Sequence, residues 1–227
     1  MINCAAYTDV EAAESEESVA TTINGSAVGV IGQWAADRKG RLLTFSTDYV
    51  FDGTATTPYT ESSATGPLNA YGRSKLVGER LALTSGALVV RTSWLVSGSH
   101  PNFVSTILEA ARSRPVQVVD DQVGSPTVAS DLARVSWAAL TEGATGLLHV
   151  TNQGQASRFD LARRALMEAE MDPGLVVPRS SRERPTIVRR PAYSVMTSER
   201  LQELGLPPPP HWEESLGAVV AEIIGRL

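Results

Sequence analysis

The stretch RLLTFSTDYVF, residues 41–51, predicts a strand that ends in polar side chains. Its first part, RLLTFS, is short and apolar like a buried strand, and a loop rich in glycine, proline and threonine follows from Asp52 to Pro67. In open sheets of alternating strands and helices, ligands bind beyond the carboxyl ends of the strands. Thr47 and Asp48 therefore lie where chemistry is expected. The alternative is an ordinary turn, because Ser, Thr and Asp also favour turns.

Helices and strands alternate on both sides of this stretch. Residues 14–40 begin acidic and end basic, as a helix dipole favours, and predict a helix that follows a strand at 2–6. Residues 68–84 have helical periodicity, and ALVVR at 87–91 predicts another buried strand. This alternation predicts an α/β fold with a doubly wound parallel sheet.

The later chain predicts a less regular series of the same elements. We expect helices at 101–114, 128–140, 157–169 and 198–204 and from Trp212 onward, strands at 116–120 and 146–150, and a proline connector at 207–210. The four consecutive prolines are stiff and extended, which is typical of a linker between two helices.

Composition narrows the class of protein. The chain has 227 residues, a formal net charge of −5 and one cysteine, Cys4, so it has no internal disulfide. Nothing in its charge indicates a nucleic-acid surface, no apolar run reaches the roughly 20 residues of a membrane span, and the first residues do not resemble a signal peptide. We expect a cytoplasmic protein without nucleic-acid or membrane partners. The densest basic stretch, residues 179–191, is either a solvated loop or an anion site for a phosphorylated ligand.

The glycines of NGSAVGVIG look like a nucleotide-binding fingerprint. Gly25, Gly29 and Gly32 have suitable spacing, and Asp48 follows at about the distance of a ribose contact. That motif needs a strand before its first glycine, whereas the preceding residues have a helical pattern. Spacings of four and three place the glycines on one face of a helix, so we expect close packing of this helix on the sheet.

The sequence YGRSK, residues 71–75, contains a tyrosine and a lysine four positions apart. On a helix this spacing brings the Tyr71 phenol and the Lys75 ammonium onto one face. A nearby cation lowers the pKa of a tyrosine, which would make Tyr71 a better proton shuttle near neutral pH. The pair alone is a weak signal, but it gains weight from Thr47 upstream at the end of a strand.

Together these residues resemble the extended branch of the short-chain dehydrogenase/reductase superfamily, and more narrowly the dTDP-4-dehydrorhamnose reductase family. The similarity covers nearly the whole chain, through NCAAYTDVEAAE, STDYVFDG, the stretch ending in Glu61, PLNAYGRSKLVGE, VVRTSWLV, NFVSTILEAA, VVDDQVGSPTVASDLA and RRPAYSVMTSERL. No single piece is specific, whereas the series in this order is.

The resemblance implies a reaction and its catalytic residues. The chain would use NADPH or NADH to reduce the C4 keto group of dTDP-4-dehydro-L-rhamnose, giving dTDP-L-rhamnose. Tyr71 would donate the proton, Lys75 would bind the nicotinamide ribose, and Thr47 would hydrogen-bond the keto oxygen. Asp48 and Trp94 match positions that contact the sugar nucleotide.

The resemblance also implies further binding residues. The expected cofactor-binding set is Ala5, Ala6, Thr8, Phe45, Tyr71 and Lys75. Arg190, with Arg189, would meet the substrate diphosphate, and Asn24 either supports the site or is a plain polar helix residue. His100, His149 and His211 lack zinc-ligand spacing, so no metal ligand is expected. Relatives use Mg²⁺ in some cases, but no ligands for it can be placed here.

The family pattern begins with a strand, a glycine-rich turn and a helix, which the match at residues 2–8 places before this sequence. We therefore expect a partial Rossmann-like sheet whose first βα units are missing. Residues 1–94 would form the truncated dinucleotide-binding domain, with 128–165 returning to it, and 95–127 and 166–227 the smaller substrate-binding portion. Three explanations stay open: a fragment or misassigned start, a shortened protein whose homodimer completes the sheet, or a catalytically inactive homologue that acts as a binding or regulatory subunit.

Overall fold

The structure is a computed structural model that describes residues 1–183 and 186–226. The chain divides into two compact units, which are described one by one. Unit 1 contains Met1–Thr92, Val135–Val150 and Thr186–Pro207, and unit 2 contains the described residues among 93–134, 151–185 and 208–227. These ranges differ in detail from the expected division. Which unit holds a cofactor and which holds a substrate stays a prediction.

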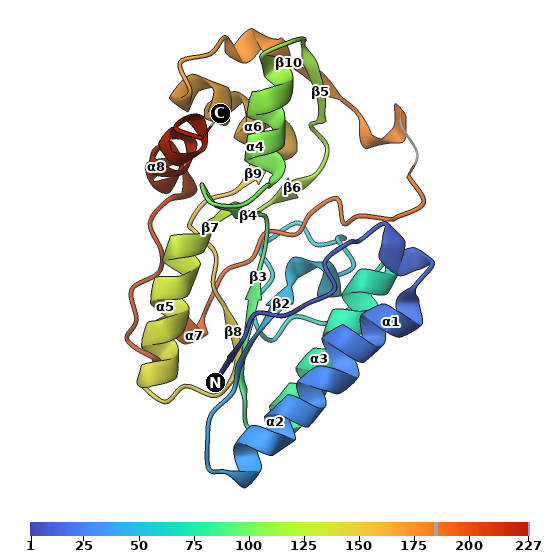
Figure 1. The fold of residues 1–227 in the computed structure, drawn as a ribbon, viewed down its shortest axis with the longest axis vertical. Helices are drawn as coiled ribbons and strands as arrows, with labels where there is room; N and C mark the ends of the chain where they lie inside the picture. Colours follow the sequence, from blue (N-terminus) through green and yellow to red (C-terminus); the bar gives the residue numbers. More distant parts are fainter. Residues whose placement is uncertain (184–185, 227) are drawn as a thin grey trace. The chain divides into compact units, whose positions relative to one another are not determined.

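Unit 1 is built on a four-stranded parallel sheet (Figure 1). Its strands lie in the order β1 (Ile2–Asn3), β2 (Leu43–Thr47), β3 (Leu88–Thr92) and β8 (Gly146–His149). Every residue of β3 is buried, because this strand is paired on both sides. The expected α/β fold with a parallel sheet is confirmed.

The first strand is shorter and more exposed than expected. The sequence predicts a buried strand at 2–6, whereas β1 has two residues that pair only with Leu43 and Thr44 of β2. Ile2 is 42% exposed. Within the described part of the chain β1 lies at the edge of the sheet, so one side of it has no neighbouring strand to cover it.

Helices that precede and follow β2 along the chain lie side by side in unit 1 (Figure 1). The helix predicted at 14–40 is a run from 17 to 37 with a π-helical turn at Thr22–Ser26, between α1 (Glu17–Thr21) and α2 (Ala27–Asp37). A 3-10 turn, Ala12–Glu14, precedes it. The second helix is α3 (Ala70–Thr84), close to its predicted bounds.

The three glycines of this helical run do pack closely, but their partner is α3 rather than the sheet. A Cβ atom on Gly25 would lie 2.8 Å from Val77, one on Gly29 would lie 3.1 Å from Leu81, and one on Gly32 would collide with the Ser85 hydroxyl. The partners on α3 are themselves four residues apart, so two matching helix faces meet. The helix does pack on the sheet as expected, through Val28 and Ala35, which share an apolar cluster with Val89 of β3, whereas the glycines themselves face α3.

Unit 2 packs α4 (Phe103–Ala111), α6 (Arg158–Glu168) and α8 (Trp212–Ile224) around one apolar core that includes Leu108, Leu161 and Leu216. Its strands form three pairs: β5 (Val116–Val119) with β10 (Val176–Arg179), β4 (Leu95–Val96) with β7 (Thr127–Val128), and β6 (Val123–Gly124) with β9 (Ala156–Ser157). Helix α5 (Ala129–Thr141) begins in unit 2 and ends in unit 1, and α7 (Arg200–Glu203) belongs to unit 1. None of the described helices combines the length and the apolar character that crossing a bilayer requires.

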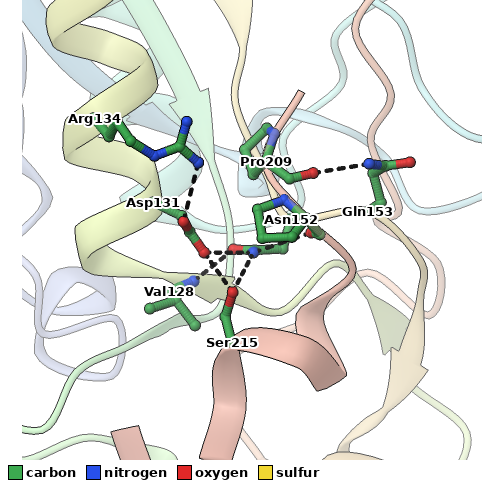
Figure 2. Close-up of polar contacts among 8 residues, drawn as sticks. Val128, Asp131, Arg134, Asn152, Gln153, Pro209 and Ser215 are labelled. Atoms are coloured by element: carbon green, nitrogen blue, oxygen red, sulfur yellow. Dashed lines mark hydrogen bonds and ion pairs between the residues drawn. The ribbon is translucent and has the colours of Figure 1, made fainter. Parts of the chain in front are cut away.

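Asn152 ties three segments of unit 2 together (Figure 2). It is 1% exposed, and its Oδ1 accepts the Val128 backbone N–H at 2.8 Å. Its Nδ2 donates to Asp131 at 2.8 Å and to the Pro210 carbonyl at 3.1 Å. Ser215, at the start of α8, donates to the same Asp131 oxygen at 2.6 Å. The side chains of Asn152 and Asp131 therefore hold the start of α5, the proline connector and α8 together.

We expect Asn152→Ala to lower the free energy of unfolding by about 2 kcal/mol or more, because it leaves buried hydrogen-bonding groups without partners. Gln153→Ala is the matched control: Gln153 is exposed and donates to the neighbouring Pro209 carbonyl at 2.9 Å, so its loss is expected to cost under about 1 kcal/mol. Urea unfolding measures both. Equal losses for the two variants would contradict the anchoring role.

Candidate active site

Thr47 and Asp48 follow one another at the carboxyl end of β2. The Thr47 hydroxyl donates to Asp48 Oδ1 at 3.0 Å and accepts the Tyr49 backbone N–H at 3.2 Å. Asp48 is buried, and its Oδ2 accepts a hydrogen bond of 2.6 Å from Ser194. The turn that sequence reasoning weighed as an alternative is present as a 3-10 turn at Asp48–Val50, and it fixes both side chains at the end of the strand.

Helix α3 places Tyr71 next to the carboxyl end of β2. Asn69 begins the helix: its side chain accepts the Gly72 N–H at 2.8 Å and donates to the Arg189 carbonyl at 2.9 Å. Gly72 packs against the Tyr49 carbonyl so closely that a Cβ atom would collide with it. The Tyr71 and Tyr49 rings make an edge contact at 5.9 Å. A side chain at position 72 would therefore push the first turn of α3, and Tyr71 with it, away from β2.

The electrostatics of Tyr71 differ from the expectation. Burial and the negative charge of Asp48 raise the pKa of Tyr71 above its usual value of 10, and a hydrogen bond between Tyr71 and Thr47 opposes them. The sequence predicts a pKa lowered by Lys75. That prediction is not met, because the groups that act on the phenol are the carboxylate and the low-polarity surroundings. The phenol is thus held in its protonated form at neutral pH.

Lys75 lies one turn further along α3 and is 6% exposed. Burial lowers the pKa of Lys75 to about 8, and the charge of Glu79 partly offsets this. Within the described residues its ammonium group makes no hydrogen bond or ion pair. Buried amines are normally satisfied, so this one is suited to a hydroxyl group supplied by a ligand.

Asn24 stands in the π-helical turn and joins two parts of the site. Its side chain accepts the Tyr7 N–H at 2.9 Å and donates to the Tyr7 carbonyl at 3.0 Å and to Ser74 at 2.9 Å. Ser74 in turn donates to the Tyr71 carbonyl at 2.8 Å. The loop around Tyr7 is thereby held against α3. Sequence reasoning left the role of Asn24 undecided, and this geometry favours the supporting role.

The residues expected along the cofactor lie in or beside this loop. Ala5 and Thr8 are exposed and Ala6 is half-buried, so small side chains line an open stretch of backbone. Phe45, half-buried on β2, borders the same small hollow as Lys75 and Asn24.

Arg190 reaches the site from the later part of unit 1. Its guanidinium pairs with Glu11 at 2.6 Å and hydrogen-bonds Tyr49, the ring that contacts Tyr71. Trp94 belongs to unit 2. Among the described residues, no group of three or more His, Cys, Asp or Glu side chains is placed to hold a metal ion, so the structure adds no support for Mg²⁺.

The chain is similar to known proteins along nearly its whole length. The family described as "RmlD substrate binding domain" matches residues 1–224. A "dTDP-4-keto-6-deoxy-D-glucose reductase" of Streptomyces niveus is 40% identical, covering 95% of this chain and 76% of that protein. A "dTDP-4-dehydrorhamnose reductase" of Mycolicibacterium smegmatis is 41% identical, covering 99% of this chain and 71% of that protein.

The chain is also similar to solved structures along nearly its whole length. A dTDP-4-dehydrorhamnose reductase from Clostridium acetobutylicum superimposes with a TM-score of 0.94 at 34% identity, over 100% of this chain and 80% of its own. The reductase of the same name from Bacillus anthracis, solved in complex with NADP, has a TM-score of 0.93 at 35% identity, over 97% of this chain and 79% of its own.

Proposed function

The chain belongs to the RmlD substrate binding domain family of dTDP-4-dehydrorhamnose reductases, and we propose that it reduces the C4 keto group of dTDP-4-dehydro-L-rhamnose with NADPH or NADH, giving dTDP-L-rhamnose. The observation that carries the proposal is the hydrogen bond between Tyr71 and Thr47 at the carboxyl end of β2, with Lys75 on the same helix beside Phe45 and Ser46 of that strand. Relatives with the same name, one of them solved with NADP, support the cofactor and the substrate class.

Tyr71 is the proposed proton donor to the sugar O4. Its raised pKa keeps the phenolic proton in place at neutral pH, so the proton is available when negative charge develops on the keto oxygen. Thr47 bonds the same phenol, and its hydroxyl is proposed to hydrogen-bond the keto oxygen and align it. The proposed substrate-binding residues are Thr47, Asp48, Trp94 and Arg190.

A nicotinamide cofactor fits the residues of unit 1. When bound, it supplies the hydride of the reduction. The buried ammonium of Lys75, which has no hydrogen-bond partner within the described residues, is suited to a ribose hydroxyl, and the backbone at Ala5 and Thr8 is exposed. The proposed cofactor-binding residues are Ala5, Ala6, Thr8, Phe45, Tyr71 and Lys75.

The test is an assay of NADPH and NADH oxidation with dTDP-4-dehydro-L-rhamnose. A parallel assay with dTDP-4-keto-6-deoxy-D-glucose is needed, because the Streptomyces niveus relative bears that substrate in its name. Turnover that is faster with the rhamnose precursor supports the proposal. Faster turnover of dTDP-4-keto-6-deoxy-D-glucose would show that the chain catalyses the same kind of reduction on a different substrate. Binding of dTDP-sugar without any turnover would instead support the alternative of a catalytically inactive binding subunit.

The burial of Lys75 predicts a stability cost that depends on pH. Its pKa is about 8 in the folded protein, against an ordinary pKa of 10.5 for an exposed lysine, so the unfolded chain binds more protons between these values and stability rises with pH through that window. We expect Lys75→Met to be more stable than the parent by roughly 2–3 kcal/mol at pH 7, a gain that disappears near the unfolded pKa. Urea unfolding at several pH values measures it. A gain that does not change with pH would contradict the assignment.

A further inference from the structure

The backbone of Trp94 has an unusual conformation. Its φ is 46°, in the left-handed region that residues other than glycine seldom adopt. The segment is held in place by its neighbours: the buried Ser93 hydroxyl donates to the Ser125 carbonyl at 2.6 Å, and the Thr127 N–H donates to the Trp94 carbonyl at 3.2 Å. Such strain persists only where surrounding contacts enforce it, and it is concentrated at functional sites.

The indole ring of Trp94 is held on two sides. A Cβ atom on Gly124 would lie 2.5 Å from Cε2 and 2.8 Å from both Cζ2 and Nε1, so the backbone of Gly124 lies over the ring. The guanidinium carbon of Arg158 lies 3.7 Å from the ring centre. Two groups this close cannot share one face, so the indole lies between Gly124 and Arg158.

The pairing of β6 with β9 sets the distance between Gly124 and Arg158. Gly124 is paired with Ala156, and the Arg158 N–H donates to the Gln122 carbonyl at 3.3 Å. Gly124 on β6 and Arg158, which begins α6 directly after β9, are thus held beside one another. The guanidinium also lies 5.0 Å from the centre of the Phe103 ring, which restricts it further.

The indole ring that lies between Gly124 and Arg158 has one polar group, its N–H. Within the described residues, the Trp94 indole N–H has no hydrogen-bond acceptor, although the ring is half-buried. A donor that is rigidly held, partly desolvated and unpaired is prepared to bind an acceptor oxygen.

We infer that Gly124 and Arg158 are positioning residues that fix the Trp94 indole so that its N–H can donate to an oxygen of the sugar nucleotide. The inference rests on the proposed function, in which Trp94 contacts that substrate. Gly124 acts by having no side chain, and Arg158 acts through a cation–π contact, which stabilises a ring orientation most strongly when it is shielded from water.

The test is the binding of dTDP-L-rhamnose, measured by titration calorimetry, to the parent chain and to Arg158→Met, Arg158→Lys and Gly124→Ala. We expect the dissociation constant to rise about 5–20-fold in Arg158→Met, with partial rescue by lysine, and KM for the dTDP-sugar to rise while kcat changes little. The control is Arg38→Met, since Arg38 lies 4.3 Å over the exposed ring of Trp34 in unit 1. It should bind like the parent.

The outcomes separate the inference from the proposed function. A parent chain that does not bind dTDP-L-rhamnose overturns both. A parent that binds, with Arg158→Met within twofold of it or no weaker than Arg38→Met, overturns the inference alone. The midpoint of urea unfolding verifies that each variant is folded. If Gly124→Ala does not fold, Arg158→Met and Arg158→Lys are sufficient to test the inference.

Discussion

Replacing Tyr71 with phenylalanine is expected to lower kcat for the dTDP-sugar by about 100-fold to 10,000-fold, the range that a positioned general acid contributes. The change removes one hydroxyl and keeps the ring, whose edge contact with Tyr49 at 5.9 Å preserves the local packing. Steady-state NADPH oxidation measures the loss. Because the hydroxyl serves the transition state, kcat should fall much further than the affinity for dTDP-L-rhamnose.

Tyr59→Phe is the matched control for this substitution. Tyr59 is also a buried tyrosine of unit 1, and its hydroxyl donates to Asp52 at 2.9 Å. We expect its loss to affect stability slightly and kcat within a few-fold. A Tyr71→Phe protein with at least half of the parental kcat would exclude Tyr71 as the proton donor.

The backbone plan could be predicted from the sequence where local pattern and tertiary structure agree. The buried strand at 87–91 and the helix at 68–84 have clear periods, and they appear as β3 and α3 within a residue or two. The strand at 2–6 could not be placed as well. An apolar run shows only that a segment can be buried, and β1 lies at the edge of the described sheet, where a strand is paired on one side.

Parts of the candidate site depend on contacts that no local pattern reveals. Gly72 reads as an ordinary residue of YGRSK, yet its missing side chain is what lets α3 approach the Tyr49 carbonyl. The π-helical turn that aims Asn24 at Tyr7 and Ser74 depends on residues 17 positions before it and 50 positions after it. The direction of the Tyr71 pKa shift follows from Asp48, whose orientation only the fold decides.

Sequence reasoning missed the role of Glu79, although its position gave a signal. It follows Lys75 by one turn on α3, so Tyr71, Lys75 and Glu79 share a face. Its carboxylate accepts Arg91 Nε at 2.8 Å and Nη2 at 2.7 Å, and the Ser46 hydroxyl at 2.5 Å. These contacts hold α3, which carries Tyr71 and Lys75, against Ser46 of β2 and Arg91 of β3.

Glu79→Ala is expected to lower the free energy of unfolding by about 3–5 kcal/mol, the cost of leaving one partner of a buried ion pair uncompensated. Glu79 and Arg91 are each 3% exposed. Arg91 also contacts His149 at 3.4 Å, but burial lowers the pKa of His149 to about 4, so that ring is neutral at pH 7 and brings no compensating charge.

Glu17→Ala tests whether burial, rather than pairing itself, sets this cost. Glu17 pairs with Arg73 of the same helix at 2.7 Å, also through two oxygens, but the two side chains are 44% and 43% exposed. Water replaces most of what an exposed pair loses, so we expect a cost below about 1 kcal/mol. Urea unfolding of both variants gives the comparison. If Glu79→Ala cost no more than Glu17→Ala, the buried pair would not be what holds α3 on the sheet. The placement of Tyr71 would then have to rest on its other contacts, such as those of Gly72 and Asn69.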